Sequence, residues 1–70
     1  MNQSFAVVIE PAGSNYSAYV PDLPGCVATG ATREDAIEEI RAAIRFHIDG
    51  LQEDNAEPPI IHATVAMVEV

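Results

Sequence analysis

Apolar and polar positions divide the chain into three short strand-like segments, one helix and a final apolar segment. Residues 4–10 are rich in β-branched and aromatic types, which predicts a first strand. Pro11 is expected to end it, because proline cannot continue the hydrogen-bond ladder of a central strand. Turn formers at 12–15, followed by large and small side chains that alternate over 16–20, predict that the first two strands form a hairpin.

The next residues predict a sharp turn, a weaker strand and the start of a helix. Two prolines and a glycine lie within residues 21–25, and in the strand at 26–31 Gly30 is compatible with a β-bulge. The Thr32 hydroxyl is expected to accept a backbone N–H of the first helical turn, with Asp35 placed as the acidic partner of a capping box. Apolar positions then recur at steps of three and four, which predicts one buried helical stripe. Its members are Ile37, Ile40, Ile44, Ile48 and Leu51.

The end of the helix is followed by a polar loop and an apolar strand. Gly50 marks the expected C-terminus of the helix to within a turn, and residues 52–59 are polar and end in two prolines. Residues 60–70 are apolar on both alternating sides. One side carries Ile61, Ala63, Val65 and Met67, and the other carries Ile60, Ala66, Val68 and Val70. A strand that is apolar on both sides is normally covered on both. The second set therefore forms a candidate interface, because a single helix covers only one side.

These elements predict an α+β domain that spans residues 1–70, with two layers and the order strand-strand-strand-helix-strand. The last strand is expected beside the first and parallel to it, reached by a right-handed crossover. The predicted sheet is therefore four-stranded and mixed, with the helix on one face.

Composition narrows the classes of partner. Three arginines, no lysine and eleven acids give a net charge of −8, which argues against direct binding of nucleic acid and favours a basic partner. A chain of 70 residues buries a small core, and its single cysteine excludes an internal disulfide, so self-association is the expected supplement. The N-terminal residues resemble neither a signal peptide nor a membrane span, which favours the cytoplasm.

The residues with chemical potential are few. Cys26 could pair with His47 or His62, but a small buried thiol and two histidines at an interface or rim form the simpler interpretation. The acids at the start of the helix are typical of a solvated face, and no metal ligand set or cofactor motif is predicted. Phe46 falls half a turn from the apolar stripe, which leaves two readings open: a single exposed aromatic side chain, or the anchor of a second contact surface.

A longer pattern carries a family resemblance. The run YSAYVPDLPGCVATGATREDAIEEIRAAI resembles the HicB-like antitoxin family, whose pattern has a tyrosine-containing strand, P-D-L-P-G-C, then G-x-T and an acidic helix start. The resemblance covers nearly the whole chain. The matching positions are Tyr19, Pro21, Asp22, Pro24, Gly25, Cys26, Gly30 and Thr32. In the loop, the prolines set the path, Gly25 supplies positive φ, and Asp22 is expected to bond neighbouring backbone N–H groups.

The resemblance implies a cytoplasmic, non-enzymatic protein with a degraded ribonuclease H-like fold that neutralises a small basic, mRNA-cleaving toxin of the HicA type. Family members often carry a further C-terminal DNA-binding part, which is not expected within residues 1–70. An alternative is an orphan homo-oligomeric module that binds a ligand or regulates another process. A vestigial nuclease that uses Glu10 is a third hypothesis, and the least favoured.

Overall fold

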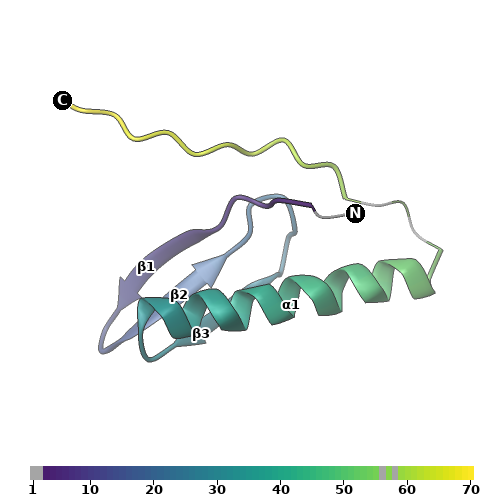
Figure 1. Ribbon diagram of the computed structural model, residues 1–70, viewed down its shortest axis with the longest axis horizontal. Coiled ribbons are helices and arrows are strands. Elements are labelled where there is room, and N and C mark those ends of the chain that lie inside the picture. The colour runs from purple at the N-terminus through teal and green to yellow at the C-terminus, as the bar shows by residue number, and fades with distance from the viewer. Residues whose placement is uncertain (1–2, 56, 58) are drawn as a thin grey trace.

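The computed structural model describes residues 3–55, 57 and 59–70, and consists of one antiparallel sheet covered by one helix (Figure 1). Strands β1 (Val8–Ala12), β2 (Asn15–Tyr19) and β3 (Val27–Gly30) are hydrogen-bonded in the order β1-β2-β3. Helix α1 (Arg33–Glu53) follows β3 and lies across one face of the sheet. The predicted helix and meander are thus confirmed, with shifted strand bounds. Of the three strands, α1 contacts β3 most and β1 least.

The first hairpin closes through a two-residue loop. Its register runs from Val8 opposite Tyr19 to Ala12 opposite Asn15, and Gly13 has a φ of 66°. A positive φ at the first loop position suits a tight hairpin turn, and glycine adopts it without steric cost. Pro11 lies inside β1 and does not end it. The strand continues because β1 is at the edge of the sheet, where a missing N–H is tolerated.

The loop between β2 and β3 consists of two successive turns, each with a proline at its second position. The Leu23 N–H donates to the Val20 carbonyl at 3.1 Å, and the Cys26 N–H donates to the Leu23 carbonyl at 3.0 Å. The second turn places Pro24 and then Gly25, with a φ of 83°, at its centre, as a type II turn requires. The Val20 N–H closes the loop on the Cys26 carbonyl at 3.2 Å. Leu23, 2% exposed, is thereby held in the core.

Helix α1 begins as the sequence predicts and ends one turn later than Gly50. The Thr32 hydroxyl accepts the Asp35 N–H at 3.0 Å, and Thr32 has an extended backbone, as expected of an N-cap. At the other end, the Asp54 N–H donates to the Gly50 carbonyl at 3.2 Å, so the last turn passes through Gly50. Asn55 follows with a φ of 55°, the left-handed conformation that asparagine tolerates at a helix end.

The core lies between α1 and the end of the sheet that carries the β2–β3 loop. Its buried members are Ala18, Val20, Leu23, Cys26, Ala36 and Ile40. Gly30 is paired in regular register with Tyr16, so it does not form the bulge that the sequence suggests. It lies instead where β3 packs closely against α1. A Cβ at Gly30 would contact the Ala36 backbone nitrogen and lie 2.7 Å from the Asp35 carbonyl carbon. The missing side chain lets α1 approach β3.

The predicted fourth strand is wrong for the part of the chain that the structure describes. Residues 60–70 are extended but pair with no strand of the described sheet, which has three antiparallel strands and no parallel pair. The ribonuclease H-like arrangement, which needs that strand, is therefore not formed by the residues that the structure describes. The physical reason is that strand propensity selects an extended backbone without selecting its partner. In this chain, the beginning of the segment is held at the β2–β3 loop and the remainder runs away from the sheet (Figure 1).

Candidate interaction surfaces

The C-terminal segment, residues 60–70, is the largest exposed apolar feature among the described residues. Among residues 3–55, 57 and 59–70, nine large apolar side chains are exposed, and six of them lie in this segment. They are Ile60, Ile61, Val65, Met67, Val68 and Val70. Both alternating sides are uncovered, with Met67 95% and Val68 78% exposed, so the helix does not cover either one. A soluble monomer rarely presents this much contiguous apolar surface, and such a patch indicates an interaction site.

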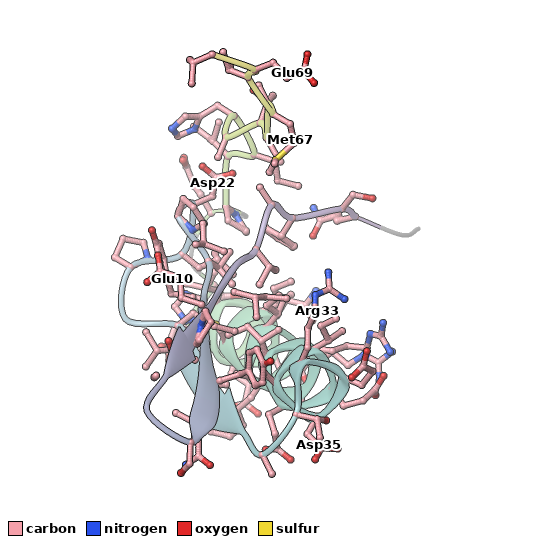
Figure 2. The ribbon with its side chains drawn as sticks, turned by 90° about the vertical axis from the view of Figure 1, so that its left-hand side faces the viewer. Glu10, Asp22, Arg33, Asp35, Met67 and Glu69 are labelled. Carbon is pink, nitrogen blue, oxygen red and sulfur yellow. The ribbon has the colours of Figure 1, made fainter. Side chains whose placement is uncertain are left out.

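The C-terminal segment is tied to the body of the protein through Asp22 (Figure 2). The Asp22 carboxylate accepts the His62 N–H at 3.2 Å and the Ala63 N–H at 3.1 Å. The His62 ring also lies beside it, with Nδ1 at 3.5 Å from Oδ1. The Asp22 side chain is only 2% exposed, so these donors take the place of water at its carboxylate oxygens. We call this contact the Asp22 latch. It corrects the expectation that Asp22 bonds neighbouring residues, because its partners lie 40 and 41 positions away.

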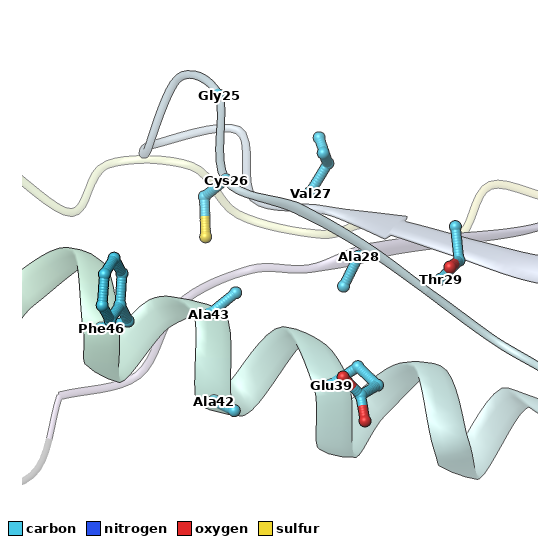
Figure 3. A pocket seen from close by; sticks show the side chains of 9 residues that line it. All are labelled: Gly25, Cys26, Val27, Ala28, Thr29, Glu39, Ala42, Ala43 and Phe46. Carbon is cyan, nitrogen blue, oxygen red and sulfur yellow. The ribbon is translucent and has the colours of Figure 1, made fainter.

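A second surface lies between α1 and the open edge of β3 (Figure 3). It is a shallow groove of about 580 Å³, and we call it the β3–α1 groove. Cys26 and Ala28 point from the sheet side toward the helix, and Phe46 stands at one end. The Phe46 ring is 82% exposed, in agreement with its position off the apolar stripe. The other residues that line the groove are Gly25, Val27, Thr29, Glu39, Ala42 and Ala43.

The first half of α1 carries exposed acids beside this groove. We call them the acidic patch: Glu34, Asp35, Glu38 and Glu39. Arg41 pairs with Glu38 at 2.7 Å, and both side chains are more than half exposed. A pair this exposed contributes little to stability. Arg41 offsets the charge of Glu38, whereas Glu34, Asp35 and Glu39 form no ion pair among the described residues, so the patch stays negative and Glu39 extends it into the β3–α1 groove.

The Cys26–histidine pairings considered above and a metal-binding cluster are not found among the described residues. Cys26 is 5% exposed, and burial raises the pKa of its thiol, which disfavours the reactive thiolate. His62 lies at the Asp22 latch, and His47 is half-buried on α1. Within the ranges that the structure covers, no three His, Cys, Asp or Glu side chains gather as metal ligands. The described helix does not have the long apolar stretch that a membrane-spanning helix needs.

Most of the motif positions quoted above lie at the β2–β3 loop, whereas Gly30 and Thr32 lie at the other end of β3, where the chain leads into α1. The resemblance extends beyond the motif, because a family model matches most of the chain. A sequence model of the HicB-like antitoxin of bacterial toxin-antitoxin systems matches residues 5–69. The chain belongs to the HicB-like antitoxin family. The family is one of antitoxins of bacterial toxin-antitoxin systems, and the chain has the α+β fold described above.

Relatives of this HicB-like chain occur in a phage, an archaeon and a bacterium. A 14.9 kDa protein from the rep–hol intergenic region of Haemophilus phage HP1 is 40% identical over 79% of this chain. The match covers 41% of that phage protein, which is therefore considerably longer than the region shared with this chain. A UPF0150 protein of Thermoplasma acidophilum is 34% identical over 81% of this chain and 93% of its own length. A UPF0150 protein of Helicobacter pylori is 40% identical over 67% of this chain and 65% of its own.

The predicted site residues of the HicB-like chain fall into two separate groups. The motif residues form the β2–β3 loop and the start of α1, where Cys26 is buried while Pro21 and Pro24 are exposed. The candidate interface residues do not form one surface. Phe46 lies beside β3, whereas Ile60, Ala66, Val68 and Val70 lie in the C-terminal segment. Sequence reasoning missed the Asp22 latch, because no local signal connects a loop carboxylate with two amides 40 residues later.

Proposed function

We propose that this HicB-like chain is a cytoplasmic antitoxin that binds and neutralises a small basic, mRNA-cleaving toxin of the HicA type. In this proposal it acts by covering the toxin and not by catalysis. The observation that carries the proposal, beside the family membership, is the exposed acidic patch at the start of α1 in a chain of net charge −8. A concentrated negative field accelerates encounter with a basic protein and disfavours nucleic acid as a direct ligand.

The β3–α1 groove is the proposed place of contact. It combines an exposed aromatic side chain, Phe46, with a carboxylate, Glu39, and an exposed valine, Val27. Aromatic anchors surrounded by polar groups are typical of the residues that dominate binding energy in protein interfaces. The adjoining acidic patch would orient the toxin, and Phe46 would hold it.

The test uses the product of the reading frame that adjoins this gene. Its expression alone is expected to stop growth, and co-expression of the HicB-like chain is expected to restore it. The affinity of the purified pair should fall steeply between low and half-molar salt, because the Debye length contracts to a few ångströms. A neighbouring product that is harmless, or that does not bind this chain, overturns the proposal.

Matched variants separate the acidic patch from net charge. The pair Glu38→Gln and Glu39→Gln should weaken binding by about tenfold or more, a change of about 1.4 kcal/mol. The pair Glu53→Gln and Glu57→Gln removes the same two charges farther along the chain and should have a much smaller effect. Phe46→Ala should increase the dissociation rate, since anchors act mainly after encounter. Equal effects of the two glutamine pairs would show that the patch is not the contact.

A second proposal concerns the chain itself: we infer that it self-associates. The exposed apolar side chains of the C-terminal segment support this inference, and they would serve an orphan homo-oligomeric module equally well. A thermal-shift screen with nucleotides and small metabolites tests that alternative, because a ligand that binds only the folded form raises its apparent stability. A stabilising ligand together with no toxin binding would favour the orphan module.

A further inference from the structure

The C-terminal segment and the β1 edge each lack a partner that the other can supply. Residues 64–70 have an extended backbone and pair with no strand in the described chain. Strand β1 is at the edge of the sheet, so one side of its backbone is unpaired. Open edges and isolated strands both carry unsatisfied N–H and C=O groups, and they readily pair with each other.

The side chains around β1 suit a neighbour that is apolar on both sides. On the face toward the helix, Phe5, Val7 and Ile9 pack against the core, and α1 contacts this side of the sheet least. On the opposite face, Val8, Tyr19 and Val27 lie directly across from one another on the three strands. A strand added beside β1 would therefore meet apolar side chains on both faces. The C-terminal segment is the part of this chain with that property.

The chain does not place the C-terminal segment against its own β1. The Asp22 latch fixes His62 and Ala63 at the β2–β3 loop, and the residues beyond it run away from the sheet in both views (Figures 1 and 2). A second copy can provide the edge that the segment does not reach in its own molecule. Two copies that exchange segments in this way are related by a two-fold axis. Each segment then pairs with the open β1 edge of the other copy, and the assembly closes as a dimer.

The distribution of charge shows where a second copy can make contact. Two chains of net charge −8 repel each other, so contact requires a surface with few acids. Residues 60–70 carry one acid, Glu69, and no arginine, whereas the other ten acids lie earlier in the chain. The segment is thus the part that can approach a second acidic molecule at little electrostatic cost.

We propose that two copies exchange residues 64–70 as a strand, each segment pairing with the β1 edge of the other copy and leaving its own body at the Asp22 latch. This proposal rests on the self-association inferred above and is independent of any toxin. It assigns Asp22 a positioning role: the carboxylate sets the point at which the strand crosses to the second copy.

Disulfide trapping between two differently labelled chains tests the exchange directly. Cys26→Ala provides a background without cysteine, since Cys26 is the single native cysteine. One chain carries Val8→Cys in β1, and the other carries Val65→Cys, Met67→Cys or Val68→Cys in turn. Oxidation of the mixture should give a covalent heterodimer for at least one pairing. Val27→Cys on the opposite edge strand is the matched control and should trap poorly.

Mass and affinity measurements complete the test. The unmodified protein should sediment as a dimer or a higher even oligomer, and Val68→Glu should raise the dissociation constant about tenfold or more. Val27→Glu, the same change at an exposed valine outside the C-terminal segment, should change it much less. Asp22→Asn should weaken the dimer while far-ultraviolet circular dichroism stays unchanged.

Three outcomes distinguish failure of the exchange from failure of self-association. A monomer at micromolar concentration would overturn both. An oligomer that traps through Val27→Cys, or through two C-terminal segments and not through Val8→Cys, would overturn the exchange alone. A double variant with Val8→Cys and Val68→Cys that closes within one chain at monomer mass would show that the segment pairs with its own β1, which also overturns the exchange.

Discussion

Gly30 provides a test of how closely α1 packs on the sheet, because the same substitution at Gly50 should have the opposite effect. Gly30→Ala introduces a Cβ against the backbone of the first helical turn, 2.7 Å from the Asp35 carbonyl carbon and 2.9 Å from the Ala36 Cα. Both neighbours are backbone atoms, so no side chain can move aside. Gly50 lies inside α1, and a Cβ there meets nothing within 4 Å.

The expected magnitudes follow from these two environments. Overpacking a tight contact typically costs about 1–3 kcal/mol, and Gly30→Ala should reach the upper part of that range because α1 must shift as a unit. Gly50→Ala should stabilise the protein by about 0.8–1.0 kcal/mol, the difference in helix propensity between the two residues. A domain of this size has a total unfolding free energy of roughly 4–10 kcal/mol, so both changes are large enough to measure.

Urea unfolding followed by circular dichroism measures both effects. With a slope of about 1 kcal/mol per molar urea, a loss of about 2 kcal/mol lowers the midpoint by about 2 M. Both variants must be compared at one protein concentration, because self-association adds to apparent stability. A Gly30→Ala protein as stable as the wild type, with an unchanged oligomeric state, would refute the argument that the missing side chain sets the helix–sheet distance.

Three further predictions concern the loop, the cap and the buried thiol. Leu23→Ala should lower the unfolding free energy by about 2–5 kcal/mol, measured by urea unfolding, because Leu23 is 2% exposed; a loss under about 1 kcal/mol would contradict its place in the core. Thr32→Ala should cost about 1 kcal/mol in the same assay, whereas Thr32→Ser keeps the hydroxyl and should cost much less; equal losses would argue against the Asp35 N–H bond. Burial raises the pKa of Cys26 above 9.0, so the folded state holds this proton at alkaline pH when the unfolded state has released it. Stability from this group is complete below pH about 8 and should decline as the pH rises through the folded pKa. Cys26→Ala should remove that part of the decline in urea titrations between pH 7 and 10.

The local elements could be predicted from the sequence, because each depends on neighbouring residues. The Thr32 cap, the apolar stripe of α1 and the positive φ of Gly25 involve contacts over a few positions, where spacing and side-chain chemistry determine geometry. The PDLPGC run determined a turn for the same reason, and its resemblance to one family pointed correctly to the HicB-like antitoxins. Phe46 was recognised as exposed because helical periodicity places it off the stripe.

Long-range placement was decided only by the tertiary structure. Local chemistry predicts a strand end at Pro11, yet Pro11 lies within β1, because the cost of a proline depends on whether the strand is central or at an edge. Asp22 was assigned to its own loop, whereas its carboxylate holds two amides from the other end of the chain. The apolar pattern of residues 60–70 predicts a fourth strand beside β1, but the described sheet has three strands and this segment pairs with none of them. Periodicity records which side chains avoid water, while the choice of neighbour depends on which edges and faces the rest of the fold leaves open.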